Sequence, residues 1–169
     1  AKYLLGWLYI NGLGVPDDPV MARTLFESAA QKEVVNAQFQ LGLMVETGKT
    51  FHKDPAEAAR WYAKAAQHGH TKAQYNLAQL YRNGNGVAQD YGKARMLYES
   101  AAKSGYTPAL EALGDIYNNG YGITKDYSAA NEWYERAALN NSPYALLHLG
   151  YMAQLGLGSP PNAALAAAY

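Results

Sequence analysis

The chain repeats itself every 36 residues from one end to the other, and its five copies align without an insertion or deletion. One leucine and one glycine recur in register in every copy: Leu5, Leu41, Leu77, Leu113 and Leu149, and Gly12, Gly48, Gly84, Gly120 and Gly156. Tandem repeats of about 20 to 50 residues are typical of solenoids, in which each copy is one supersecondary unit that buries its apolar face against its neighbours. The period therefore limits the fold before any single residue is interpreted.

Within each copy, the spacing of apolar residues predicts a first helix, which we call helix A. In the third copy, Ala73, Leu77 and Leu80 follow one another at the intervals of a helical face. This helix is predicted to end near Arg82, because Gly84 follows and glycine readily adopts the positive φ that ends many helices.

A second helix, helix B, is predicted to begin after Asp90, whose carboxylate can accept hydrogen bonds from the free N–H groups of the first turn. The second copy has the same start, with Asp54, Pro55 at the first helical position and Glu57 at the third, which is a capping-box arrangement. Helix B of the third copy is predicted to end before Gly105.

Small residues in fixed registers indicate close packing between the two helices of a copy. In the fourth copy, Gly114 and Ala130 are predicted to lie where the backbones of helices A and B approach, with Tyr117, Trp133 and Tyr134 around the crossing. One such hairpin cannot bury its apolar faces alone, but a stack of them can. The sequence predicts an all-α fold, an α/α solenoid that forms a right-handed superhelix, with one domain of about five copies (1–36, 37–72, 73–108, 109–144 and 145–169).

Charge and composition exclude several classes of function. Lys and Arg number 14 and Asp and Glu also number 14, so the chain has no basic field with which to bind nucleic acid. The chain has no cysteine, which excludes disulfides and thiolate metal sites. The longest purely apolar run, residues 163–169, is too short to span a bilayer, so no membrane insertion is expected.

The third copy, from residue 73 to 105, resembles the Sel-one-like repeat family, which is related to the tetratricopeptide repeats. The most specific marks of the family in this chain are the loop sequence G-x-G-V-x-x-D and the sequence W-Y-x-x-A-A, which occurs at 61–66 and 133–138. The resemblance covers the whole chain in five copies. The resemblance implies an α/α solenoid that acts as a scaffold or adaptor for other proteins, with no catalytic residues and no cofactor. It favours a bacterial protein that is periplasmic or otherwise exported, with the cytoplasm as the alternative.

The second, fourth and fifth copies depart from the family pattern, the fifth through Ser159-Pro160-Pro161-Asn162 and the alanine-rich sequence after it. Thr50 and Phe51 replace the usual Gly and Val, which predicts a different loop in the second copy, and Asn140 and Asn141 replace a terminal Gly. The first and last copies lack the polar face of a capping repeat, so we expect a fragment of a longer chain whose ends could stack on another molecule.

A partner is expected on helix A, because helix A lines the concave side in the solenoids that this chain resembles. Helix A positions that face neither the sister helix nor the next copy vary between copies, whereas the packing positions do not. The candidate partner-binding residues are Trp7, Asn11, Phe39, Tyr75, Gln79, Arg82, Asn83, Glu111, Asp115, Asn118 and Asn119.

These candidates suggest the chemistry of a protein or peptide partner. Asn11, Asn83 and Asn119 share one register, and an amide can both donate to and accept from an extended backbone. The alternative is that these residues only end helix A beside glycine.

Aromatic candidates lie in the first three copies and acidic candidates in the fourth. Trp7, Phe39 and Tyr75 could anchor an apolar part of a partner, and Glu111 and Asp115 a basic part. The alternative for the aromatic residues is packing between repeats.

Other signals point to structure rather than to catalysis. The Gly84-Asn85-Gly86 segment lacks the strand and the further glycine of a phosphate loop, and His68 and His70 have no obvious third metal ligand. We therefore expect no enzyme, no cofactor and no metal site. The alternative to a peptide-binding scaffold is a structural spacer module in a larger envelope or secretion assembly.

Overall fold

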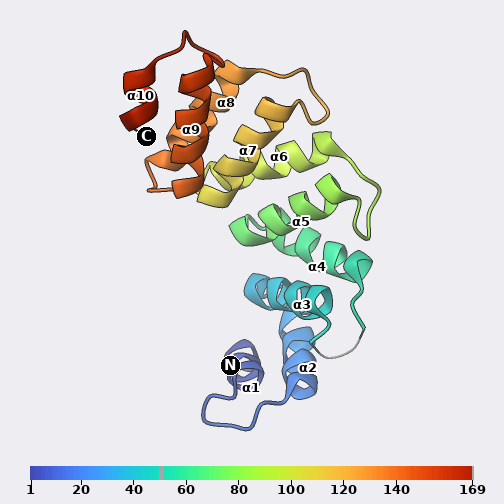
Figure 1. Cartoon of the computed structure of the whole chain (residues 1–169). Helices are drawn as coiled ribbons and strands as arrows, with labels where there is room; N and C mark the ends of the chain where they lie inside the picture. Colours follow the sequence, from blue (N-terminus) through green and yellow to red (C-terminus); the bar gives the residue numbers. More distant parts are fainter. Residues whose placement is uncertain (50–51, 169) are drawn as a thin grey trace. The chain divides into compact units, whose positions relative to one another are not determined.

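The computed structural model describes residues 1–49 and 52–168, and this part of the chain is folded into helices with no strand (Figure 1). The helices are α1 (Lys2–Asn11), α2 (Pro19–Ala30), α3 (Val35–Thr47), α4 (Pro55–Gln67), α5 (Thr71–Asn83), α6 (Tyr91–Ala102), α7 (Thr107–Asn119), α8 (Tyr127–Ala138), α9 (Pro143–Leu155) and α10 (Ala163–Ala168). The odd-numbered helices are helix A of the five copies and the even-numbered ones are helix B. The predicted all-α solenoid is confirmed, while the predicted loop change at Thr50 and Phe51 lies outside the described residues.

The chain divides into two compact units, Ala1–Gln89 with α1 to α5 and Asp90–Tyr169 with α6 to α10. In the first unit each helix packs against the next along the chain, from α1 to α5, and the second unit follows the same rule from α6 to α10. Nearest-neighbour packing of this kind is what a solenoid requires, because each copy buries its apolar face only against adjacent copies. None of the described helices is both long and apolar enough to cross a membrane.

The ends of helix A follow the glycine register. The residue after each helix A adopts the left-handed conformation, with φ between 61° and 74°: Gly12, Gly48, Gly84, Gly120 and Gly156. The predicted glycine stop is thus confirmed in all five copies, for the reason that a residue with a Cβ rarely adopts this conformation.

An aspartate in the same register caps the start of helix B in the first four copies. The side chains of Asp18, Asp54, Asp90 and Asp126 each accept a hydrogen bond of 2.9 Å from the backbone N–H three residues later. Asn162 caps α10 in the same way, since its Oδ1 accepts a hydrogen bond of 3.0 Å from Leu165 N.

The capping box expected at Asp54 is only half formed. The Asp54 side chain accepts from Glu57 N, but the Asp54 N–H donates to the carbonyl of Val45 at 3.2 Å. The Glu57 carboxylate instead accepts from Arg23 Nη2 at 3.0 Å and from Trp61 Nε1 at 3.2 Å. A tertiary partner on α2 and a side chain one turn along α4 therefore bond the carboxylate that the capping box would have used.

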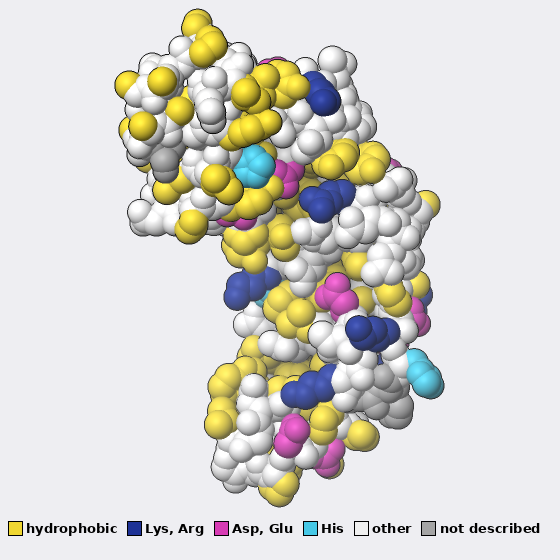
Figure 2. All heavy atoms as spheres, in the orientation of Figure 1, with side chains coloured by type: hydrophobic (Ala, Val, Ile, Leu, Met, Phe, Trp, Pro, Cys, Tyr) yellow, Lys and Arg dark blue, Asp and Glu magenta, His cyan; other side chains and the backbone are white. Residues whose placement is uncertain are grey.

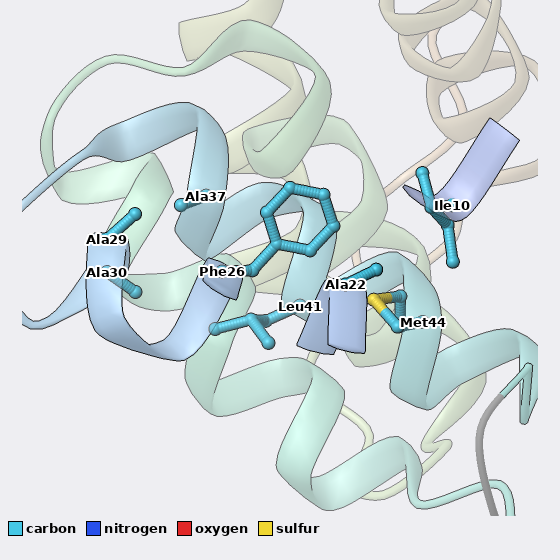
Figure 3. Close-up of a cluster of buried hydrophobic side chains, with 8 residues drawn as sticks. All are labelled: Ile10, Ala22, Phe26, Ala29, Ala30, Ala37, Leu41 and Met44. Carbon is cyan, nitrogen blue, oxygen red and sulfur yellow. The ribbon is translucent and has the colours of Figure 1, made fainter. Parts of the chain in front are cut away.

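The hairpins of the first, second and fourth copies are each built around one aromatic ring on helix B and one glycine on helix A. A Cβ built on Gly42 would lie 2.4 Å from Tyr62 Cε1, and one on Gly6 would lie 2.9 Å from Phe26 Cε1. Phe26 lies in the core of the first unit with seven other buried side chains (Figure 3): Ile10, Ala22, Ala29, Ala30, Ala37, Leu41 and Met44.

The fourth copy has the same arrangement, and it corrects one expectation. The space that Gly114 leaves open is filled by the ring of Tyr134, whose Cε1 would lie 2.4 Å from a Cβ there. The sequence predicts that a close approach of the two backbones near Ala130 requires this glycine, with Tyr134 around the crossing. The nearest atoms belong instead to an aromatic side chain that is fully buried.

The second glycine of the loop motif has a separate role between copies. A Cβ on Gly86 would lie 2.3 Å from the carbonyl carbon of Pro55, and one on Gly122 would lie 2.5 Å from Tyr91 Cβ. In both cases the neighbour is the first residue of helix B in the preceding copy. A Cβ on Gly14, at the same position in the first copy, would have nothing within 4 Å.

Candidate partner-binding face

The predicted residues lie on α1, α3 and α5 of the first unit and on α7 of the second. Trp7 is 40% exposed, whereas Phe39 is only 9% exposed. Tyr75, Gln79 and the remaining candidates Arg82, Glu111, Asp115 and Asn118 are half-buried, and Asn11, Asn83 and Asn119 are exposed.

The asparagine register ends helix A. Asn11, Asn83 and Asn119 are the last residues of α1, α5 and α7, each followed by a left-handed glycine. The amide of Asn11 donates to Trp7 O at 2.7 Å, and that of Asn119 donates to Asp115 O at 2.9 Å. One amide proton in each of these two side chains therefore satisfies a helix carbonyl, which leaves the second proton and the oxygen for a partner.

The three aromatic candidates differ in what they contact. Phe39 stacks on the ring of His70, with centroids 4.3 Å apart, and lies 5.9 Å from the ring of Tyr62. The hydroxyl of Tyr75 accepts a hydrogen bond of 2.7 Å from Gln79 Nε2. Trp7 thus offers the largest exposed aromatic surface of the three.

A pocket of about 480 Å³ opens beside the first turns of α1, α3 and α5, within the first unit. Its walls include Tyr3, Asn36, Phe39, Gln40, His70 and Lys72. We call it the His70 pocket. Phe39 belongs to the predicted set, and Tyr3 occupies the same outward register one copy earlier. Asn36, His70 and Lys72 lie instead at the starts of helix A.

His70 has a structural task in this pocket. Its Nδ1 accepts a hydrogen bond of 3.1 Å from Ala73 N and so caps α5. Burial lowers the pKa of His70, and the positive charge of Lys72 lowers it further. His68 and His70 are not joined into a metal site, since no group of three or more His, Asp or Glu side chains in the described parts of the chain could hold a metal ion.

The two acidic candidates on α7 accept hydrogen bonds from the following helices. Asp115 Oδ1 accepts from Tyr134 OH at 2.8 Å and from Tyr144 OH at 2.7 Å. Glu111 Oε1 accepts from Ser142 Oγ at 2.5 Å. Burial, together with the charge of Asp115, raises the pKa of Tyr134 far above its ordinary value, so the phenol stays protonated and keeps donating.

Helix α9 carries an apolar stripe that the predicted set does not include. Leu147, Tyr151 and Leu155 recur every four residues and are 71%, 58% and 50% exposed. Figure 2 shows hydrophobic side chains gathered on the surface of this part of the second unit. The sequence already places these residues on the outward face of helix A, because they occupy the same registers as Glu111, Asp115 and Asn119 in the preceding copy.

Comparisons with known proteins agree with this architecture. The Sel1 repeat model matches residues 1–34, 35–70, 71–106, 107–142 and 143–169. No curated protein matches the chain.

Two solved structures are similar over 99% of this chain. One is a protective antigen of uropathogenic Escherichia coli strains with an SLR fold, at 36% identity and a TM-score of 0.96. The other is a Sel1 repeat protein from Oxalobacter formigenes, at 34% identity and a TM-score of 0.95. The chain spans 36% of the first protein's length and 69% of the second's. The repeats seen in the sequence, the helix pairs and these matches together show that the chain belongs to the Sel1 repeat family.

Proposed function

We propose that this chain is a non-catalytic scaffold that binds a peptide or protein partner on the outward face of helix A. Sel1 repeat proteins are generally scaffolds for protein interactions. The finer assignment, to a face and to a kind of partner, rests on the side chains of this chain.

The observation that carries the proposal is the contrast between two registers of helix A. The fifth position of each copy is leucine throughout. The seventh position is Trp7, Leu43, Gln79, Asp115 and Tyr151, and none of these side chains is buried. A surface that differs from copy to copy on a constant frame can recognise an extended partner residue by residue.

The chemistry of the face differs between the two units. In the first unit, Trp7 and Tyr75 supply aromatic surface for an apolar part of the partner. In the second unit, Glu111 and Asp115 supply carboxylates on α7, which favours a basic part there.

The alternative, a spacer module, is supported by the hydrogen bonds within the repeats. Asp115 accepts from Tyr134 and Tyr144, and Asn11 and Asn119 donate to helix carbonyls, so these polar groups also stabilise the frame. A spacer would need this frame but no specific outward face.

Site-specific crosslinking separates the two functions. A photoreactive phenylalanine analogue is placed at Trp7 or Gln79 on helix A, and at Val20 or Met96 on helix B as matched controls. Val20 and Met96 are 56% and 66% exposed, so access to the crosslinker is not limiting there. We expect one partner band from the helix A positions and none from helix B. Crosslinks from helix B alone would contradict the proposed face and support the spacer.

A further inference from the structure

The His70 pocket combines aromatic walls with groups that donate hydrogen bonds. The pocket is open to solvent and has a volume of about 480 Å³, which is enough for one side chain and the backbone beside it. Phe39 forms a buried wall fixed by stacking on His70, and the half-buried Tyr3 forms another. The ring of Tyr3 lies 5.8 Å from that of Phe26, so the core holds both aromatic walls in place.

The donors of the pocket follow from how His70 is bonded. Because Nδ1 accepts from Ala73 N, the neutral ring carries its proton on Nε2, where it can be donated. Asn36 and Gln40 add side-chain amides. The ammonium group of Lys72 adds three further donors and a full positive charge.

The described residues that line the pocket carry positive charge and no negative charge. Lys72 is a cation, and none of the described lining residues is Asp or Glu. Lys72 and Asn36 are exposed, so a ligand can reach them without rearrangement of the fold. An anion with an apolar neighbour complements both the charge and the aromatic walls.

We propose that the His70 pocket binds the carboxylate of an acidic side chain in an extended partner segment, with Lys72 and His70 Nε2 as the principal donors. This inference rests on the proposed function and specifies it, because the pocket lies at the start of the same helices whose outward face is assigned to the partner. An apolar residue next to the acidic one packs against Tyr3 and Phe39.

The direct test uses small probes on the intact chain. Resonances of His70 and Lys72 are followed by NMR during titration with acetyl-glutamate amide, with acetyl-glutamine amide as the neutral match. Acetyl-leucine with a free carboxyl terminus tests whether the pocket instead binds the C-terminal carboxylate of a peptide. We expect saturable shifts at both residues with the glutamate probe only. Equal shifts with the glutamine probe, no shifts, or a response to the terminal carboxylate alone would overturn the proposal.

A charge-reversal experiment extends the test to peptides. Random peptides are selected on the native chain and on Lys72→Glu, with Lys103→Glu, an exposed lysine in the turn after α6, as the matched control. Peptides from the native chain are expected to carry Asp or Glu beside an apolar residue. Their affinity should fall about tenfold or more with Lys72→Glu and stay unchanged with Lys103→Glu.

The variant His70→Ser separates binding from folding. Ser142 occupies the same register two copies later, and its Oγ accepts from Ala145 N at 3.0 Å, so serine can cap the helix there. We expect His70→Ser to weaken binding of the acidic peptides while the helix content is kept. If selected peptides bind through Trp7 and Gln79 but show no acidic preference and no response to Lys72→Glu, the pocket assignment fails and the scaffold function stands.

Discussion

The ring of Tyr134 on α8 fills the space beside Gly114 on α7, and its hydroxyl donates to the next residue, Asp115, at 2.8 Å. One aromatic residue thus fixes both the distance between the two helices and a polar contact at their crossing. Tyr62 does the same in the second copy, with Gly42 beneath its ring and Glu46 as the acceptor of its hydroxyl at 2.5 Å.

Gly114→Ala is expected to destabilise the chain by about 1–3 kcal/mol, because the added methyl group forces the buried ring of Tyr134 to move. The midpoint of urea unfolding, followed by circular dichroism, measures the change. Gly92→Ala is the control, since its new Cβ would approach only the Asp90 side chain, at 3.3 Å. The control should be neutral or stabilising by up to about 1 kcal/mol, and equal losses in the two variants would disprove the ring-and-glycine explanation.

Gly122→Ala and Gly14→Ala separate contact between copies from backbone strain. Both glycines have positive φ, 69° and 73°, so alanine is strained at either position. Only at Gly122 would the Cβ also meet a neighbour, Tyr91 Cβ at 2.5 Å. We expect Gly14→Ala to cost about 1 kcal/mol and Gly122→Ala to cost about 1–3 kcal/mol more, measured as unfolding midpoints. A similar cost for both would show that the loop conformation alone requires glycine.

Tyr134→Phe is expected to cost about 1.5–3 kcal/mol, because the variant removes a hydrogen bond to a charged acceptor, Asp115. Tyr144 still donates to the same oxygen, which should keep the loss toward the lower end of this range. Tyr151→Phe is the control, since Tyr151 is 58% exposed. Thermal unfolding compares the two, and a Tyr134→Phe variant as stable as the control would mean that this contact adds nothing to stability.

Alkaline pH should destabilise the chain through its buried tyrosines. Burial raises the pKa of Tyr62 and of Tyr134 above the ordinary value of 10.0. The unfolded chain therefore releases these protons at a lower pH than the folded chain, so their stabilisation is complete below about pH 10 and falls as the pH rises. Unfolding midpoints measured from pH 8 to about pH 11 test how steeply stability falls with pH. The double variant Tyr62→Phe/Tyr134→Phe should have a shallower slope, and an unchanged slope would contradict this cause.

Mild acid should destabilise the first unit through His70. Burial, with the charge of Lys72, lowers the pKa of His70 in the folded state, so the unfolded chain binds the proton more readily. The neutral cap of α5 is fully favourable above the ordinary pKa of 6.5, and its contribution is lost as the pH falls below that value. His70→Ser should remove this part of the pH dependence, as measured by unfolding midpoints between about pH 8 and pH 5. His52→Ser, at an exposed position, is the control, and an equal effect of both would contradict the assignment to His70.

Much of the fold could be predicted from the sequence because the determining interactions are local. A glycine in register ends each helix A, since the left-handed conformation depends on the residue itself, as at Gly84 and Gly120. Asp90 and Asp126 start helix B because an aspartate at the N-cap position can accept a hydrogen bond from the N–H three residues later. The 36-residue period then predicted the stacking of copies, and the resemblance carried by the loop and W-Y-x-x-A-A motifs predicted the family.

The partners of the side chains were decided only by the tertiary structure. Glu57 bonds Arg23 and Trp61 rather than completing its local capping box, and Asp115 accepts from Tyr144 of the next copy. His70 lines a pocket because the packing of the helices brings Phe39 of α3 and Tyr3 of α1 to the start of α5. Such contacts depend on the rotamers and spacing of helices that are far apart in the chain, which a single repeat does not encode. The sequence by itself determined where helix A ends, where helix B begins and that the copies stack. The packing between helices decided which polar side chains form hydrogen bonds within the repeats and which stay exposed.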